Sequence, residues 1–219
     1  MLSEVLDGDR ARVPLRFRVP EEFQEIALEE PSEVRATRTF MSFQRTLRLT
    51  QQQALHLAFS QEYLLARLRD EGAVYVGQCV ARSEADPTAL TSAQYTILVK
   101  KADLDADDVL DLLAGGLRTP SQPREVLLAE YSAGKALVVG EELVVTSPHG
   151  PLGELRLTTH RVRQAQVILP FPDRRRLAVI GVSTENLADW KAYVEILDGI
   201  AQSVSFTEPP ARSIARALG

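Results

Sequence analysis

The chain has 219 residues, 45% of them hydrophobic, which is ordinary for a globular protein with a sizeable core. Its net charge of −5 argues against a general nucleic-acid binder, since such proteins carry excess Lys and Arg to displace counterions from phosphate. The one cysteine, Cys79, rules out an internal disulfide. Because no segment is signal-like and none has the ~18 apolar residues of a membrane span, we expect a cytoplasmic protein without membrane insertion.

Two early segments have strand-like patterns. In "VPLRFRVP" the apolar residues Val13, Leu15, Phe17 and Val19 alternate with polar positions, which predicts a half-buried strand. Pro14 places the start of this strand at a sheet edge, because proline has no backbone N–H to donate to a neighbouring strand. The segment "RTFMSFQRTLRL" (residues 38–49) alternates less regularly, and we expect a second strand there.

A helix is predicted from Thr50 to Glu71. Thr50 and Gln53 form a capping-box pattern, and Gly72 is a natural C-terminal stop. The apolar residues at helical spacing between them are Leu57, Leu64, Leu65 and Leu68. Residues 73–81 and 92–100 follow as two strands, joined by the kind of polar, proline-containing loop that hairpins use.

The C-terminal half adds a short helix over residues 104–116 and strand-like runs over 124–131, 135–145 and 153–162. In residues 165–186 two apolar runs flank three arginines, which predicts two central strands joined by a tight turn that begins at Pro172-Asp173. A closing helix is predicted to bury one face, formed by Leu187, Trp190, Val194, Leu197, Ala201 and Val204.

Together these elements predict one α+β domain over residues 12–206, with a mostly antiparallel sheet and flanking helices. We expect flexible tails over residues 1–11 and 207–219.

Few residues carry recognisable chemistry. His56, His149 and His160 share no metal-ligand spacing, and Cys79 has no neighbouring base that would activate its thiol. We therefore expect no catalytic residue, no bound metal and no cofactor. The candidate interaction surface consists of Arg174, Arg175 and Arg176 together with His149, which lies in a "SPHGP" loop. The arginines are either the solvated end of a hairpin or a surface for an anionic partner, protein or phosphate.

The order of elements resembles the PsbP-like superfamily, whose members include a photosystem II extrinsic subunit and a Ran-binding nuclear-import factor. The resemblance rests on "LRFRVPEEF", on the strand pair of residues 164–184, and on the closing pattern Trp190, Tyr193, Ile200, Ser203 and Phe206. It implies an antiparallel sheet between helices, an α/β/α sandwich, and a binding or assembly role with no catalytic residues to transfer. Within the superfamily the chain is most similar in character to actinobacterial, hence bacterial, members. It departs from the superfamily pattern in the long helix after Thr50.

Two functional hypotheses remain open. The first is a non-enzymatic cytoplasmic module that binds a protein partner, an accessory factor for a larger assembly such as a secretion or envelope system. The second is a small-molecule binder or minor enzyme with a pocket between sheet and helix, lined by Tyr75, Tyr95, Tyr131, Arg163 and His160. Homo-oligomerisation is compatible with both, and "VPLRFRVP" is the candidate edge.

Overall fold

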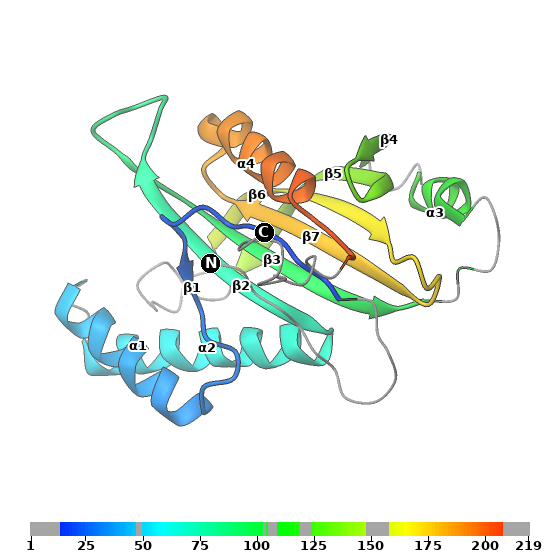
Figure 1. The fold of residues 1–219 in the computed structure, drawn as a ribbon. Coiled ribbons are helices and arrows are strands. Elements are labelled where there is room, and N and C mark those ends of the chain that lie inside the picture. Colours follow the sequence, from blue (N-terminus) through cyan, green and yellow to red (C-terminus); the bar gives the residue numbers. More distant parts are fainter. Residues whose placement is uncertain are drawn as a thin grey trace, which may run out of the picture.

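Strands from distant parts of the sequence form one seven-stranded antiparallel sheet, in the order β1-β2-β3-β7-β6-β5-β4 (Figure 1). A computed structural model describes residues 14–46, 50–102, 104, 109–118, 124–147 and 158–207. The strands are β1 Gln24–Glu25, β2 Ala73–Arg82, β3 Leu90–Lys101, β4 Arg124–Tyr131, β5 Gly134–Ser147, β6 Thr158–Pro170 and β7 Arg176–Thr184. The pairing of β3 with β7 joins the early hairpin to the C-terminal strands.

Helices lie on both sides of this sheet. They are α1 Ser32–Thr46, α2 Gln51–Asp70, α3 Val109–Leu117, the short 3-10 helix η1 Leu187–Asp189, and α4 Trp190–Gln202. In Figure 1, α1 and α2 lie on one side of the sheet and α4 lies on the other. The predicted α+β fold, an antiparallel sheet flanked by helices, is confirmed.

The main core lies between α4 and the sheet. Alternate residues of β3, β6 and β7 point to this side and are buried: Tyr95, Ile97, Ala165, Val167, Leu169, Ala178, Ile180 and Val182. Because β6 and β7 are interior strands of the sheet, their predicted central position is confirmed. On α4, Leu197, Ala201 and the following Val204 are buried as predicted, whereas Tyr193 and Ile200 take the places expected for Trp190 and Val194.

The opposite side of the sheet is covered only in part by the described helices. The residues Val76, Thr96, Gly181, Gln166 and Val139 are cross-strand partners in one row, so they point to the same side. At one end of this row Val76 packs with Leu65 of α2, and at the other end Val139 packs with Ala114 of α3. Between these ends the side chains of β3, β7 and β6 that point this way are mostly half-exposed.

The predicted N-terminal strand does not join the sheet, but the predicted alternation of buried apolar residues is present in it. Leu15 and Phe17 are buried, at 2% and 1% exposure, and Phe17 packs against Tyr75 with ring centroids 5.7 Å apart. The backbone of Arg16 makes a single isolated bridge with Ser205 and joins no strand of the sheet. Apolar residues therefore anchor this segment over the core face, and residues 14–19 belong to none of the strands β1 to β7 of the described sheet. Val13 lies outside the described residues.

The strand predicted over residues 38–49 is also wrong, because α1 extends through residue 46. The helix begins just after Pro31, whose carbonyl accepts hydrogen bonds from the N–H groups of Val34 and Arg35. Pairing with α2, described below, stabilises a helix that the irregular apolar pattern did not indicate. Residues 47–49 lie outside the described part of the chain.

Most of the remaining predicted elements are confirmed where the structure describes them, but the runs expected as separate strands over residues 153–162 and from residue 165 form one strand, β6, and α3 begins only at Val109. Thr50 and Gln53 form both hydrogen bonds of the capping box, and Gly72 adopts a φ of 88° after α2. The strands β2 and β3 form the predicted hairpin. The predicted flexible tails are residues 1–11 and 207–219. Apart from Thr207 they lie outside the described residues.

Candidate interaction surfaces

Helices α1 and α2 form a helical hairpin that is held together by a buried arginine. Arg35 is 2% exposed, and its guanidinium donates to both carboxylate oxygens of Glu62 on α2, at 2.8 and 2.6 Å. The same guanidinium donates to the carbonyls of Ala27 and Glu30, at 2.9 and 2.8 Å. Arg35 thus attaches α1 both to α2 and to the chain segment that leads into the hairpin.

The side of α2 that packs inward contains two small residues and one leucine. Ala54, Ala58 and Leu65 are buried, whereas Leu64, which we predicted to share the core face, is 59% exposed. The two alanines are four residues apart and so lie on one side of the helix, where their size permits close packing. The predicted leucine face of this helix is therefore wrong in part.

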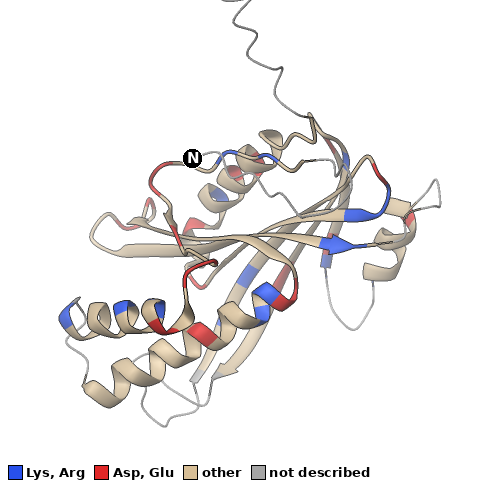
Figure 2. Ribbon diagram, turned by 60° about the horizontal axis from the view of Figure 1, so that its bottom comes forward, with Lys and Arg blue, Asp and Glu red and all other residues tan. Residues whose placement is uncertain are grey.

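The opposite side of α2 exposes large apolar residues. Leu55, Phe59 and Tyr63 are spaced by four residues, so they form one stripe along the helix, which we call the α2 stripe. Their exposed fractions are 46%, 65% and 64%. Residues 51–61 contain no Lys, Arg, Asp or Glu, and Figure 2 shows the first turns of α2 without charged residues. The part of the α2 stripe formed by Leu55 and Phe59 is therefore apolar and uncharged, whereas the Arg67 guanidinium lies beside the Tyr63 hydroxyl at the other end.

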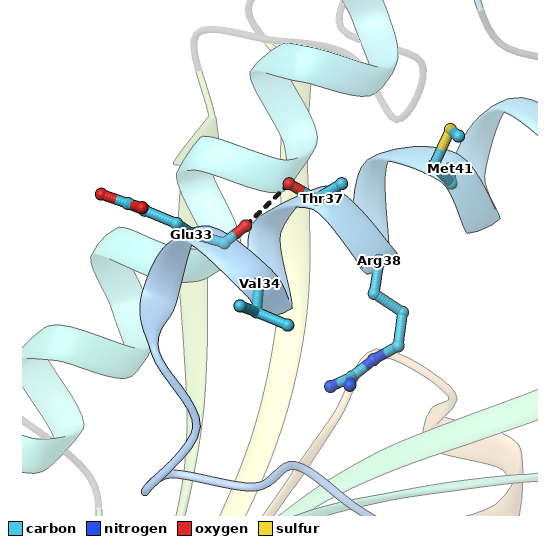
Figure 3. A pocket seen from close by; sticks show the side chains of 5 residues that line it. All are labelled: Glu33, Val34, Thr37, Arg38 and Met41. Atoms are coloured by element: carbon cyan, nitrogen blue, oxygen red, sulfur yellow. Dashed lines mark hydrogen bonds between the residues drawn. The ribbon is translucent and has the colours of Figure 1, made fainter.

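A shallow open hollow of about 420 Å³ lies on α1 (Figure 3). It is lined by Glu33, Val34, Thr37, Arg38 and Met41. Val34 and Met41 are exposed, and Arg38 is tied to both carboxylate oxygens of Glu30 at 2.7 and 2.6 Å. The hollow adds a second partly apolar surface to the helical hairpin.

The three arginines lie at the predicted turn between β6 and β7, but they differ from one another. Arg174 is exposed and adopts a φ of 55°, and Arg175 is also exposed. Arg176 is half-buried: its guanidinium lies 4.1 Å from the ring centroid of Phe171 and pairs with Asp173 at 2.7 Å. Only Arg174 and Arg175 therefore present exposed cationic side chains at this turn.

The fourth predicted site residue is His149, and the other residues considered for chemistry are His56, His160 and Cys79. His149 lies outside the described residues. His160 is on β6 with its Nδ1 3.3 Å from a carboxylate oxygen of Glu185, and His56 is on α2. Cys79 is a buried residue of the core, as expected, and burial raises the pKa of its thiol. In the described part of the chain, no group of three or more His, Cys, Asp or Glu side chains is placed to hold a metal ion.

The five residues proposed for a ligand pocket are not brought together. Tyr75, Tyr95 and Tyr131 are buried in the main core, and burial raises the pKa of Tyr75 to about 12. Arg163 stacks on Trp190, with its guanidinium carbon 4.9 Å from the ring centroid. His160 is a cross-strand partner of Val145, and the alternation along β6 directs it away from the core side that holds Ala165. The tyrosines are thus packing residues.

A row of polar residues crosses the partly open side of the sheet, one from each strand. In spatial order the row consists of Gln24, Gln78, Gln94, Ser183, Gln164, Glu141 and Arg124. At its end the Glu141 carboxylate accepts hydrogen bonds from Gln164 and, at 2.7 Å, from Arg124. The row supplies amide and hydroxyl groups rather than a nucleophile beside a base.

Comparison with known proteins does not assign the chain to a family. No family model, curated protein or solved structure matches the chain. The resemblance to the PsbP-like superfamily therefore stays a prediction. Among the residues that the structure describes, no helix is long and apolar enough to cross a membrane.

Sequence reasoning missed the α2 stripe because it assumed that the leucines of this helix face the core. A signal was present: the apolar residues of "QQQALHLAFSQEYLLARL" are distributed around the whole helix. A helix of this kind exposes apolar side chains unless it is enclosed on all sides.

Proposed function

We propose that this chain is a non-enzymatic protein-binding module that uses the α2 stripe to hold an apolar, uncharged surface of a partner protein. The observation that carries the proposal is the exposure of Phe59 and Tyr63, at 65% and 64%. Aromatic side chains bury the most area on association and are enriched in protein interfaces. Contiguous exposed apolar residues of this kind mark interaction sites in soluble proteins.

The composition of the α2 stripe favours a protein partner over a lipid surface. Helices that lie in a membrane interface carry Lys and Arg beside their apolar side, where they contact anionic headgroups. Residues 51–61, around Leu55 and Phe59, have neither; Arg67 lies beside Tyr63 at the end of the stripe, and the whole chain has a net charge of −5. An apolar protein surface requires no such charges.

The buried ion pair between Arg35 and Glu62 supports this role, because it holds the stripe on a fixed scaffold. Both carboxylate oxygens of Glu62 are bonded to Arg35, so α2 cannot rotate about its axis without breaking two hydrogen bonds. A preformed surface loses less conformational entropy on binding than a flexible one.

The alternative, a small-molecule binder or minor enzyme, has less support, because its expected tyrosines are core residues. The Arg174 and Arg175 side chains remain a candidate surface for an anionic partner. A cytoplasmic location and a link to a secretion or envelope assembly also stay predictions.

The proposal is tested by affinity capture from the source cells, followed by binding of the purified partner to variants of the chain. Phe59→Ser with Tyr63→Ser should weaken partner binding at least tenfold. Val144→Ser is the matched control, because Val144 is 69% exposed but lies on β5, far from α2 in the sheet order. Retention of binding by the double variant, or capture of nothing at any salt concentration, would contradict the proposal. If the original chain binds phosphatidylglycerol vesicles and the double variant loses this binding, the stripe is assigned to a lipid surface instead.

A further inference from the structure

The strand β4 forms one edge of the sheet, and no other strand among the described residues pairs with its outer side. Its sequence, REVLLAEY, contains two exposed leucines, Leu127 at 50% and Leu128 at 48% exposure. At the other edge β1 has only two residues. A long apolar edge strand offers unpaired N–H and C=O groups to another strand.

The register of β4 on β5 shows which backbone groups face outward. Tyr131 and Gly134 flank a two-residue turn, so they form a hydrogen-bonded pair, and every second pair from there is also hydrogen-bonded. The backbone groups of the alternate residues therefore point to the outer edge; these are Arg124, Val126, Leu128 and Glu130. The Arg118 guanidinium donates to the Val126 carbonyl at 2.9 Å, as an outward carbonyl allows.

We propose that β4 pairs antiparallel with β4 of a second copy of this chain, about a twofold axis at Leu127, to form one sheet that runs through both copies. In this register each outward residue meets an outward residue of the other copy. Val126 is opposite Leu128, and Arg124 is opposite Glu130. The two copies of Leu127 face each other at the axis, which covers the exposed leucines of the edge.

Charge selects this register over its neighbours. A shift by one residue in either direction sets outward backbone groups against groups already bonded to β5, and in one direction it also pairs Glu125 with Glu130. A shift by two residues leaves Glu130 opposite Val126 in one direction and Arg124 opposite Leu128 in the other. Only the register centred on Leu127 places a basic residue opposite an acidic one at both ends, and like charges directly opposite one another destabilise a strand pair.

One in-chain contact at this edge is compatible with the pairing and one must be released. Arg124 donates through its Nε to Glu141, which leaves its terminal nitrogens for Glu130 of the second copy. Arg118 occupies the Val126 carbonyl and must release it before the second strand binds. Because Arg118 is exposed, water can replace that hydrogen bond at little cost.

The test is the dimer dissociation constant of the full chain, measured by sedimentation velocity for charge-swapped variants. Arg124→Glu and Glu130→Arg should each raise this constant about tenfold, because each places like charges opposite one another at both ends of the pair. The double variant should restore it to within about threefold of the original, because opposite charges face each other again. Glu125→Arg is the matched control, since Glu125 faces Ala129 in this register, and it should leave the constant unchanged.

Two further variants separate edge pairing from other association. Val126→Pro removes an outward N–H that β5 does not use, so the variant should fold, as circular dichroism will show, and remain monomeric. Phe59→Ser with Tyr63→Ser should not change the dimer, because the α2 stripe is a separate surface. A protein that stays monomeric up to about 1 mM, or a dimer indifferent to the single swaps, would overturn the proposal.

Discussion

The carboxylate of Asp189 accepts a hydrogen bond from the hydroxyl of Ser83 at 3.0 Å, although 106 positions separate the two residues in the sequence. Both side chains are buried. The same carboxylate oxygen accepts from the N–H groups of Glu84 and Ala85, at 2.9 and 3.3 Å. Asp189 therefore attaches the loop between β2 and β3 to η1, the element that precedes α4.

This attachment makes stability depend on pH at acidic values. Burial by itself raises the pKa of Asp189, but hydrogen bonds from Ser83, Thr91 and two backbone N–H groups outweigh it, so the pKa lies below its ordinary value. The carboxylate thus stabilises the fold above about pH 4, and this contribution is lost as pH falls through the lower pKa of the folded state. Asp189→Asn should lower the melting temperature at pH 7 and should flatten its decline between about pH 5 and pH 2. Asp70→Asn, at an exposed carboxylate, is the control; equal profiles for the two variants would refute this role.

Removal of Arg35 should destabilise the protein strongly, because it leaves Glu62 largely buried without its cation. We expect Arg35→Ala to lower the free energy of unfolding by about 3 kcal/mol in urea titrations. Arg38→Ala should cost much less, since Arg38 pairs with Glu30 at the surface, where solvent screens the pair. Arg35→Met combined with Glu62→Met should recover most of the loss, because the unpaired charge is then absent. Equal losses for Arg35→Ala and Arg38→Ala would show that burial of this pair is unimportant.

Substitutions of the arginines in the β6–β7 turn should differ in their effect on the free energy of unfolding. Arg176→Ala should reduce the free energy of unfolding by about 1 kcal/mol, because it removes the contact with Phe171 and the pair with Asp173. Arg175→Ala should stay within about 0.5 kcal/mol of the original protein, as expected for an exposed side chain. A larger loss for Arg175→Ala than for Arg176→Ala would reverse this assignment.

Gly77 leaves the space that the ring of Tyr75 occupies. A Cβ atom at residue 77 would lie 2.3 Å from the Tyr75 hydroxyl and 2.7 Å from its ring carbon Cζ. Because Tyr75 is buried in the core, Gly77→Ala should lower the free energy of unfolding by about 2 kcal/mol, measured by chemical denaturation. Gly140→Ala is the matched strand variant, with the nearest atoms 3.7 Å away, and should be nearly neutral. Equal tolerance at both positions would mean that Tyr75 relocates without cost.

Much of the fold followed from local patterns. The capping box at Thr50, the hairpin of β2 and β3 and the turn at Pro172-Asp173 each depend on residues that are close in sequence. The buried alternation of β6 and β7 was also legible, because period-two burial follows from strand geometry. For the candidate surfaces, the position of the arginine turn could be predicted, but the different burial of Arg176 could not, because it depends on the ring of Phe171.

By itself the sequence determined where most strands and helices lie, since their patterns repeat along the chain. It predicted β6 and β7 as central strands with both sides covered, whereas only the side toward α4 is fully buried. The tertiary structure decided which elements become neighbours. It formed α1 from a segment with a strand-like pattern, where Arg35 reaches Glu62 on the next helix. It turned the alanines of α2 inward and its aromatic residues outward, and it made β4 a sheet edge in place of residues 13–19. These outcomes depend on contacts between residues far apart in sequence, whose packing no local period encodes.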